Sequence, residues 1–302
     1  MKIAFFGECM IELSGSPLQR GFGGDTLNSA LYLARLSQHN DLQVSYATAM
    51  GTDALSQTII NAWQDEQIDT ALVSQFENKQ PGLYLVETDA TGERSFLYWR
   101  SDSAVKEYFS RGISPLQKHL AELDYIYLSG ISLAVLSEQS QAQLFELLTT
   151  FKQSGGKVIF DNNFRPQLWS AEQAKQCYLK ILTLTDIALL TEDDEIAVFA
   201  DTHYQDILTR CAQLGVNEVV IKRGLLPCII ATNGSQIAEV AATKVNNVVD
   251  TCAAGDSFAA GYLSKRLLGA TVEQSATAGH LLASTVIQYP GAIIAPENMP
   301  NL

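Results

Sequence analysis

Short strand-like and helix-like runs alternate along the second half of the chain, and this alternation limits the folds open to it. The strand-like runs lie at 125–128, 158–160, 187–190 and 218–221, and the helix-like runs between them at 138–151, 171–182 and 206–214. Strands that alternate with helices of this length predict a parallel sheet covered by helices on both faces.

The remaining segments extend this pattern and add one excursion. Further strands are expected at 2–6, 44–50, 228–231 and 236–241, and further helices at 27–36, 53–63, 255–268 and 272–288. Residues 81–99 differ, because two β-prone aromatic runs flank turn residues at 89–93, which predicts a hairpin. We therefore predict one α/β domain over residues 1–302, a three-layer α/β/α core with a mostly parallel sheet and a small β-rich excursion.

The charge balance excludes broad contact with polyanions. The 302 residues include 20 lysines and arginines against 33 acidic residues, for a net charge of -13. Nucleic-acid backbones and anionic membrane surfaces both require a basic face, so neither is expected as a partner. The five cysteines are widely spaced with no Cys-x-x-Cys, and no apolar stretch approaches the roughly 18 residues of a membrane span. A cytoplasmic protein without a disulfide framework is expected.

The most informative segment is Asp250-Thr251-Cys252-Ala253-Ala254-Gly255-Asp256, which leads into an expected helix. Small side chains let a ligand approach the backbone, and the amides at a helix N-terminus favour an anion. A carboxylate in that first turn could accept a proton from an attacking hydroxyl. Asp256 could equally be an ordinary acidic residue at a helix start.

A second glycine-rich segment, residues 21–28, opens the helix expected at 27–36. It lacks the last glycine of a dinucleotide-binding fingerprint. Its backbone at Gly24 and its polar side chains Asp25 and Asn28 could hold a hydroxylated ligand, although an ordinary capped loop explains the same residues.

Two arginines could recognise a carboxylate. Arg100 follows a strand in which Tyr98 points to the same face. Arg165 follows the strand at 158–160, where the carboxyl end of a parallel strand should open onto a site. Guanidinium groups bind carboxylates in a bidentate manner, although either arginine could instead form a surface salt bridge. Lys222-Arg223-Gly224 also follows a strand end, where a glycine permits close approach of a nucleotide.

Other catalytic signatures are missing from the sequence. It contains no G-x-x-x-x-G-K-[ST], no H-R-D or D-F-G and no H-E-x-x-H, and its four histidines form no spaced cluster.

Taken in this order, Gly23-Gly24-Asp25, Asn28 and Asp250 to Asp256 resemble the signatures of the ribokinase-like (PfkB-type) carbohydrate kinases. The resemblance spans the chain. It is strongest to members that phosphorylate the 6-hydroxyl of 2-dehydro-3-deoxy-D-gluconate, and this likeness rests on residues 7–13, 23–28, 98–100, 129–131 and 161–166. It implies a ribokinase-like core with a β-lid built from about residues 8–22 and 80–100. It further implies ATP and Mg²⁺ as cofactors, and a homodimer or higher homo-oligomer formed through the lid.

The resemblance also assigns roles to residues. Asp256 corresponds to the catalytic base, and Ala253, Ala254 and Gly255 to the anion hole. The positions that correspond to substrate contacts are Gly24, Asp25, Asn28, Tyr84, Tyr98, Arg100 and Arg165. Those on the ATP side are Asn163, Lys222, Gly224, Ala253 and Gly255. Asp194 or Glu195 corresponds to an acidic residue that supports Mg²⁺, while Cys252 departs from the family's usual threonine.

Two other functions remain open at this point. One is a fructokinase-like enzyme of the same family, whose neutral substrate would give no reason to bring Arg100 and Arg165 together. The other is a nucleotide- or sugar-binding protein without catalysis, which would gain nothing from a carboxylate beside a phosphate.

Overall fold

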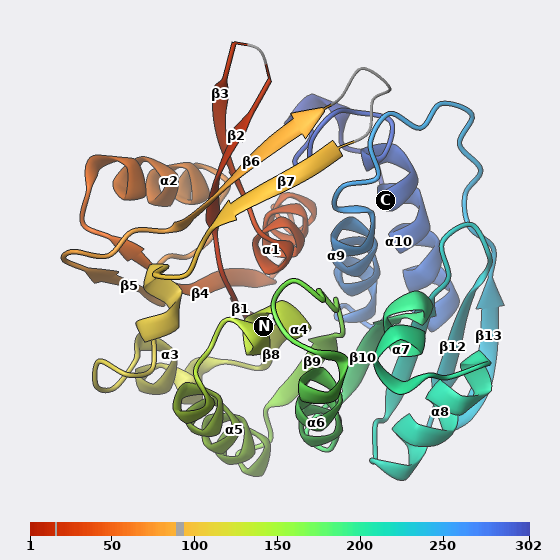
Figure 1. The fold of residues 1–302 in the computed structure, drawn as a ribbon. Coiled ribbons are helices and arrows are strands. Elements are labelled where there is room, and N and C mark those ends of the chain that lie inside the picture. Colours follow the sequence, from red (N-terminus) through yellow and green to blue (C-terminus); the bar gives the residue numbers. More distant parts are fainter. Residues whose placement is uncertain (16, 89–93) are drawn as a thin grey trace.

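The computed structural model describes residues 1–15, 17–88 and 94–302. Its centre is a large, mostly parallel sheet (Figure 1). The strands of this sheet are β1 (Lys2–Phe6), β4 (Gln43–Gly51), β5 (Val73–Phe76), β8 (Tyr125–Ser129), β9 (Lys157–Asp161), β10 (Ile187–Thr191), β11 (Glu218–Lys222), β12 (Cys228–Thr232) and β13 (Ser235–Val240).

The strand order places a topological switch beside β1. In the order β13-β12-β11-β10-β9-β8-β1-β4-β5, the chain runs from β1 to β4 and β5 on one side and later to β8 and beyond on the other. All pairs from β11 to β5 are parallel, whereas the β11–β12 and β12–β13 pairs are antiparallel. Ligands of open parallel sheets bind at the carboxyl ends of strands near such a switch.

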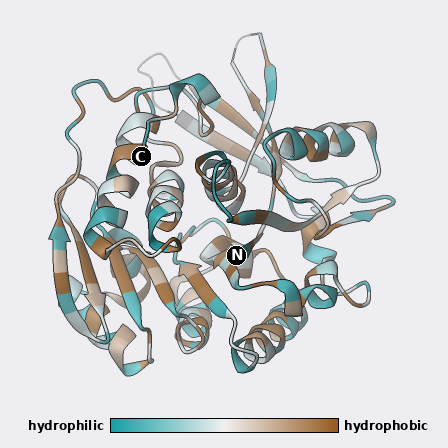
Figure 2. Cartoon of the chain, turned by 180° about the vertical axis from the view of Figure 1, so that it is seen from behind, coloured by the Kyte–Doolittle hydropathy of each residue, from teal (hydrophilic) through white to brown (hydrophobic). Residues whose placement is uncertain are grey.

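Alternating strand residues fill two apolar layers. In β1, Ala4 and Phe6 join one cluster of buried residues, whereas Ile3 and Phe5 join the other. The strands of the large sheet carry recurrent hydrophobic segments, seen from behind in Figure 2. This alternation is why both sheet faces need helical cover.

Each face has its own set of helices. One face is covered by α1 (Asp25–Leu36), α2 (Ala54–Asp65), α9 (Ala254–Arg266) and α10 (Val272–Val286). The other is covered by α5 (Glu138–Gln153), α6 (Ala171–Leu182), α7 (Glu192–Phe199) and α8 (Tyr204–Gln213). Short helices lie at α3 (Pro115–Lys118), α4 (Gly130–Ala134), η1 (Ala104–Glu107), η2 (Leu120–Glu122) and η3 (Pro296–Asn298). The predicted three-layer α/β/α core is confirmed, and none of the described helices is long and apolar enough to span a bilayer.

A small sheet stands over the carboxyl end of the large one. Its strands are β2 (Met10–Ser14), β3 (Gln19–Gly23), β6 (Gly82–Thr88) and β7 (Arg94–Trp99), in the order β3-β2-β6-β7. The β2–β6 pair is parallel, and the β2–β3 and β6–β7 pairs are antiparallel. The hairpin expected from residues 81–99 is thus present as β6 and β7, while its turn at 89–93 lies outside the described residues.

Candidate functional site

The turn that opens α9 has the backbone shape expected of an anion-binding loop. Ala253 is the N-cap residue and adopts a left-handed conformation with φ of 58°, and the helix begins at Ala254. The first amides of a helix have no carbonyl partner within the helix, so they face outward beside the positive end of its dipole. Asp256 lies in this first turn, partly buried, as the sequence predicted.

The carboxylate of Asp256 is held by a second helix. Asn28 Nδ2 donates to Asp256 Oδ2 at 2.8 Å, and Ser29 Oγ donates to the Asp256 carbonyl oxygen at 3.2 Å. Helix α1 begins at Asp25 with Gly24 at the N-cap, two residues before the start expected from the sequence. The N-terminal turns of α1 and α9 therefore meet at Asp256.

Two more strand ends bring polar groups to the same place. Asn163 follows β9, and its Nδ2 donates to Asp25 Oδ2 at 2.8 Å. Asp161 ends β9 and pairs with Lys222, which ends β11, with 2.6 Å between Nζ and Oδ2. The carboxyl end of the parallel sheet thus brings Asp161 and Asp256 within electrostatic range of both Asp25 and Lys222.

This clustering changes the acidity of Asp256. Removal from water raises the pKa of Asp256 to about 8, and the nearby charge of Asp25 adds to the rise. The hydrogen bond from Asn28 opposes it, since that bond favours the ionised form. A carboxylate with a pKa near working pH is suited to general base catalysis.

The small sheet supplies tyrosines above these helices. Tyr84 and Tyr98 are register partners in β6 and β7, with ring centroids 6.0 Å apart. The Tyr84 hydroxyl donates to Glu12, and a Cβ on Gly23 would lie 2.8 Å from that hydroxyl oxygen and 3.8 Å from Asn28 Oδ1. Tyr84 therefore lies beside the start of α1.

The two arginines lie close to Tyr98 but have different surroundings. Arg100 Cζ lies 5.7 Å from the centroid of the Tyr98 ring, and the guanidinium forms an ion pair with the buried carboxylate of Glu8. Arg165 is exposed and donates to the Phe164 carbonyl oxygen at 2.8 Å. Burial raises the pKa of Tyr98, and the positive charges of both arginines oppose this rise. The positive charges of both arginines therefore act on the Tyr98 side chain.

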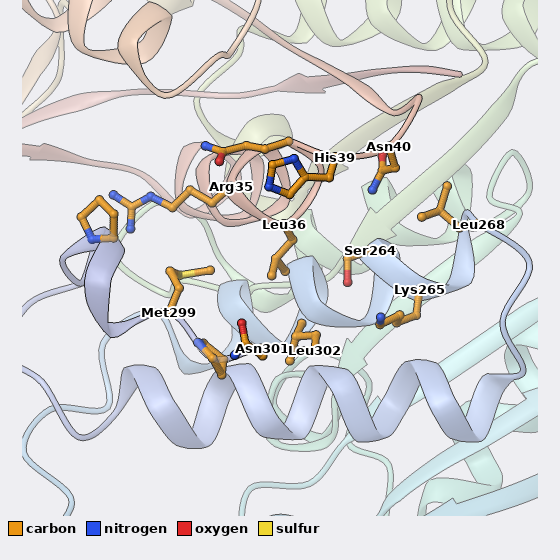
Figure 3. A pocket seen from close by; sticks show the side chains of 13 residues that line it. Arg35, Leu36, His39, Asn40, Ser264, Lys265, Leu268, Met299, Asn301 and Leu302 are labelled. Atoms are coloured by element: carbon orange, nitrogen blue, oxygen red, sulfur yellow. The ribbon is translucent and has the colours of Figure 1, made fainter.

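A cavity of about 350 Å³ lies beside Arg100. The residues that line it include Tyr98, Trp99, Arg100, Lys106, Ala134, Val135, Gln167 and Leu168. A larger cavity of about 460 Å³ lies elsewhere, between the C-terminal ends of α1 and α9 and the C-terminal segment (Figure 3). Its lining includes Arg35, His39, Lys265 and Met299, and none of the predicted site residues.

The two acidic candidates for metal support differ in availability. Glu195 is fully buried and accepts from Asn162 Nδ2 at 3.0 Å and from Arg210 at 2.6 Å. Burial raises its pKa to about 7, although Arg210 opposes the rise. Asp194 accepts from the Phe164 amide at 3.2 Å and lies within electrostatic range of Arg165 and Lys222. Asp194 therefore has the freer carboxylate.

Some predicted positions are peripheral, and some contacts were not anticipated. Gly224 lies in the exposed turn after β11 with φ of 59°. Glu8 and Asp161 were not selected as site residues, although Asp161 ends a parallel strand. That position at a strand end was the signal that could have identified Asp161.

Asp256, the turn that opens α9 and the polar groups at the strand ends thus form one cluster at the carboxyl end of the sheet. Residues 1–299 match the pfkB family of carbohydrate kinases, and the chain belongs to this family. It is 51% identical to the 2-dehydro-3-deoxygluconokinase of Escherichia coli (strain K12), over 99% of each chain. It is 52% identical to that of Dickeya dadantii (strain 3937), over 99% of this chain and 98% of the relative.

Solved structures are similar in fold. The 2-dehydro-3-deoxygluconokinase from Thermotoga maritima matches with a TM-score of 0.85 at 21% identity, over 99% of this chain and 98% of that one. The ribokinase-like fold and the family resemblance predicted from the sequence are therefore confirmed.

Proposed function

We propose that this carbohydrate kinase transfers the γ-phosphoryl group of ATP to the 6-hydroxyl of 2-dehydro-3-deoxy-D-gluconate, giving 2-dehydro-3-deoxy-6-phospho-D-gluconate. The observation that carries the proposal is the position of Asp256 in the first turn of α9, held by Asn28 at the carboxyl end of the sheet. The identity of 51–52% to kinases of that name, over nearly the full length, supports the choice of substrate.

Asp256 acts in this proposal as the general base. Its carboxylate accepts the proton of the 6-hydroxyl as the oxygen attacks the γ-phosphorus, and ADP leaves with the electron pair of the broken bond. The amides of Ala253, Ala254 and Gly255 form the anion hole for the charge on the transferring group. The left-handed turn at Ala253 supports this role because it directs successive amides outward.

The substrate contacts form two groups. Gly24, Asp25 and Asn28 lie at the start of α1 and would contact the sugar hydroxyls. Tyr84, Tyr98, Arg100 and Arg165 would contact the acid end, where the two guanidinium groups bind the carboxylate. The shared effect of both arginines on Tyr98 supports this arrangement.

ATP would bind on the other side of Asp256, along Asn163, Lys222, Gly224 and the turn from Ala253 to Gly255. We propose that Mg²⁺ accompanies it, because phosphoryl charge must be neutralised during transfer. Asp194 fits the support of this ion better than Glu195, whose two carboxylate oxygens are already bonded within the protein. Mg²⁺ in such sites keeps several waters and needs few carboxylates.

The small sheet would act as a lid, formed by about residues 8–22 and 80–100 of a single domain. Its strand β7 exposes Phe96 and Tyr98 on one face and Leu97 and Trp99 on the other, and these exposed apolar side chains support a homodimer or higher homo-oligomer formed through the lid. We also propose a cytoplasmic location, supported by five cysteines that are all free thiols.

A coupled ATP assay over a panel of acceptors tests the function. The panel contains 2-dehydro-3-deoxygluconate, its galactonate epimer, fructose, ribose and adenosine. We expect kcat/KM for the gluconate compound to exceed that for the neutral acceptors by at least about 100-fold, because a neutral acceptor forms no charged hydrogen bonds with Arg100 and Arg165. A preference for fructose would favour the fructokinase-like alternative. Tight ATP binding without turnover of any acceptor would favour a non-catalytic binder.

A further inference from the structure

A buried ion pair joins the ends of two strands next to the proposed anion hole. The side chains of Lys222 and Asp161 are 10% and 5% exposed, and their Nζ and Oδ2 atoms are 2.6 Å apart. The two residues end β11 and β9, which flank β10 on opposite sides. The Tyr127 hydroxyl, also buried, donates to the same Asp161 oxygen at 3.2 Å.

Stability does not explain this pair. Two charges taken out of water lose much of their solvation, so a buried ion pair often stabilises a protein no better than apolar residues of the same size. The loss is visible here, since burial raises the pKa of Asp161 even though Lys222 opposes the rise. An arrangement with this cost needs a reason at the site itself.

The ammonium group faces the turn that opens α9. A Cβ on Gly255 would lie 3.6 Å from Lys222 Nζ, which is ordinary van der Waals contact. The positive charge of Lys222 also acts on Asp256, where it lowers the pKa. Lys222 therefore places a fixed positive charge beside Gly255 and within electrostatic range of the proposed base.

We propose that Asp161, together with Tyr127, is a positioning residue that holds the Lys222 ammonium against the turn at residues 253–256. There the ammonium neutralises charge on the phosphoryl group during its transfer, beyond any part it plays in holding ATP. This inference rests on the proposed kinase function. A charge fixed in advance by the fold needs no reorganisation when the reaction occurs, which is why such groups accelerate the chemical step.

The test compares Asp161→Asn, Lys222→Met and the double variant with the wild-type enzyme. We expect Lys222→Met to lower kcat at least about 100-fold, and Asp161→Asn at least about tenfold. The KM for ATP should change less than about threefold in Asp161→Asn, because the lost interaction belongs to the transition state. In the Lys222→Met background, Asp161→Asn should have little further effect, since both substitutions remove one interaction.

Asp186 offers a matched control. It is as buried as Asp161 and accepts from Lys152 at 2.6 Å and Lys157 at 3.2 Å, but it precedes β10 at the opposite end of the sheet. Asp186→Asn should lower the melting temperature and leave kcat unchanged. If Asp161→Asn behaves in the same way, its role is structural and the inference is wrong.

Other results separate the inference from the function on which it rests. A loss in Asp161→Asn confined to the KM for ATP would also overturn the inference, because it would indicate ground-state binding alone. Wild-type enzyme that fails to phosphorylate the sugar acid would instead refute the proposed function. A direct readout is the affinity for ADP with aluminium fluoride and sugar acid. It should weaken in Asp161→Asn while the affinity for ATP is kept, and an equal loss of both would contradict the proposal.

Discussion

The side-chain amide of Asn28 donates to the carboxylate of Asp256 at 2.8 Å, although 228 positions separate the two residues in the chain. This bond joins the first turns of α1 and α9, and Ser29 adds a second contact to the Asp256 carbonyl oxygen. The same bond opposes the rise in the Asp256 pKa caused by burial. Asn28 therefore both orients the proposed base and keeps it more readily ionised.

Replacement of the base tests its role directly. Asp256→Asn has nearly the same shape and removes only the ability to accept a proton. We expect kcat to fall at least about 100-fold, the usual scale for a general base, with ATP binding retained. Steady-state kinetics and calorimetric titration with ATP measure the two quantities. Near-normal turnover by a folded variant would refute the assignment of Asp256 as base.

The pH dependence of kcat/KM should report the ionisation of Asp256 in the free enzyme. The base form is needed, so kcat/KM should rise with pH through the raised pKa of Asp256, which is about 8. Asn28→Ala removes a hydrogen bond that favours the ionised form of Asp256. It should move the rising limb of the pH profile to higher pH by about one unit. Asp25→Asn removes a repelling charge and should move the limb downward. Identical limbs in all three proteins would show that another group controls the profile.

The same raised pKa makes a prediction about stability. The pKa of Asp256 rises from an ordinary 3.8 to about 8 in the folded state, so between these values the folded protein binds more protons than the unfolded chain. Stability from this residue therefore falls as the pH rises from about 4 to about 8. Asp256→Asn avoids this loss and should melt at least about 2 °C above wild type at pH 8. This difference in melting temperature should disappear near pH 4. A difference that does not change with pH would show that the ionisation of Asp256 is not its cause.

The two arginines should share a kinetic effect and differ in their effect on stability. Arg100→Ala and Arg165→Ala should each raise the KM for the sugar acid at least about tenfold, since each loses a charged hydrogen bond worth about 1.5–3 kcal/mol. Arg100→Ala should also lower the free energy of unfolding by about 3–5 kcal/mol, because it leaves the buried carboxylate of Glu8 unpaired. Arg165 is exposed, and its loss should cost under about 1 kcal/mol.

A second substitution separates these two effects. Glu8→Gln combined with Arg100→Ala should recover much of the lost stability but not the KM, because only the unpaired charge has been removed. Unchanged KM in both single variants would show that the arginines do not bind the substrate carboxylate.

The large sheet could be predicted because its strands are short apolar runs separated by helices, a pattern set by local sequence. Other elements, β5 and α7 among them, were not predicted in this way. Strand β5 is a half-exposed edge strand without a clear apolar run. Helix α7 begins with four acidic residues, Glu192 to Glu195, which look like a polar loop although acidic residues favour the first turn of a helix.

The turn at residues 253–256 was also predictable, because small residues before a helix have a local meaning. The ion pairs were not. Asp161 and Lys222 are 61 residues apart, and they meet only because β9 and β11 flank β10. Glu8 and Arg100 are 92 residues apart and meet because β6 pairs with β2 in the small sheet. Such contacts depend on strand order, which no local pattern encodes.

The close approach between Gly24 and Glu8 leads to the last prediction. A Cβ on Gly24 would lie 2.1 Å from the Glu8 carbonyl oxygen, and a backbone atom cannot move aside as a flexible side chain can. Gly24→Ala must therefore displace the start of α1, which carries Asp25 and Asn28. We expect kcat/KM to fall at least about tenfold, since small misplacements of catalytic groups are costly.

Gly21 is the matched control for this substitution. It lies three residues earlier in β3, and a Cβ there would meet only the Glu12 Cβ, at 3.8 Å. Gly21→Ala should therefore keep wild-type kinetics while adding the same methyl group. Equal kinetics in both alanine variants would show that the start of α1 tolerates displacement, so that the bond between Asn28 and Asp256 is not what places the base.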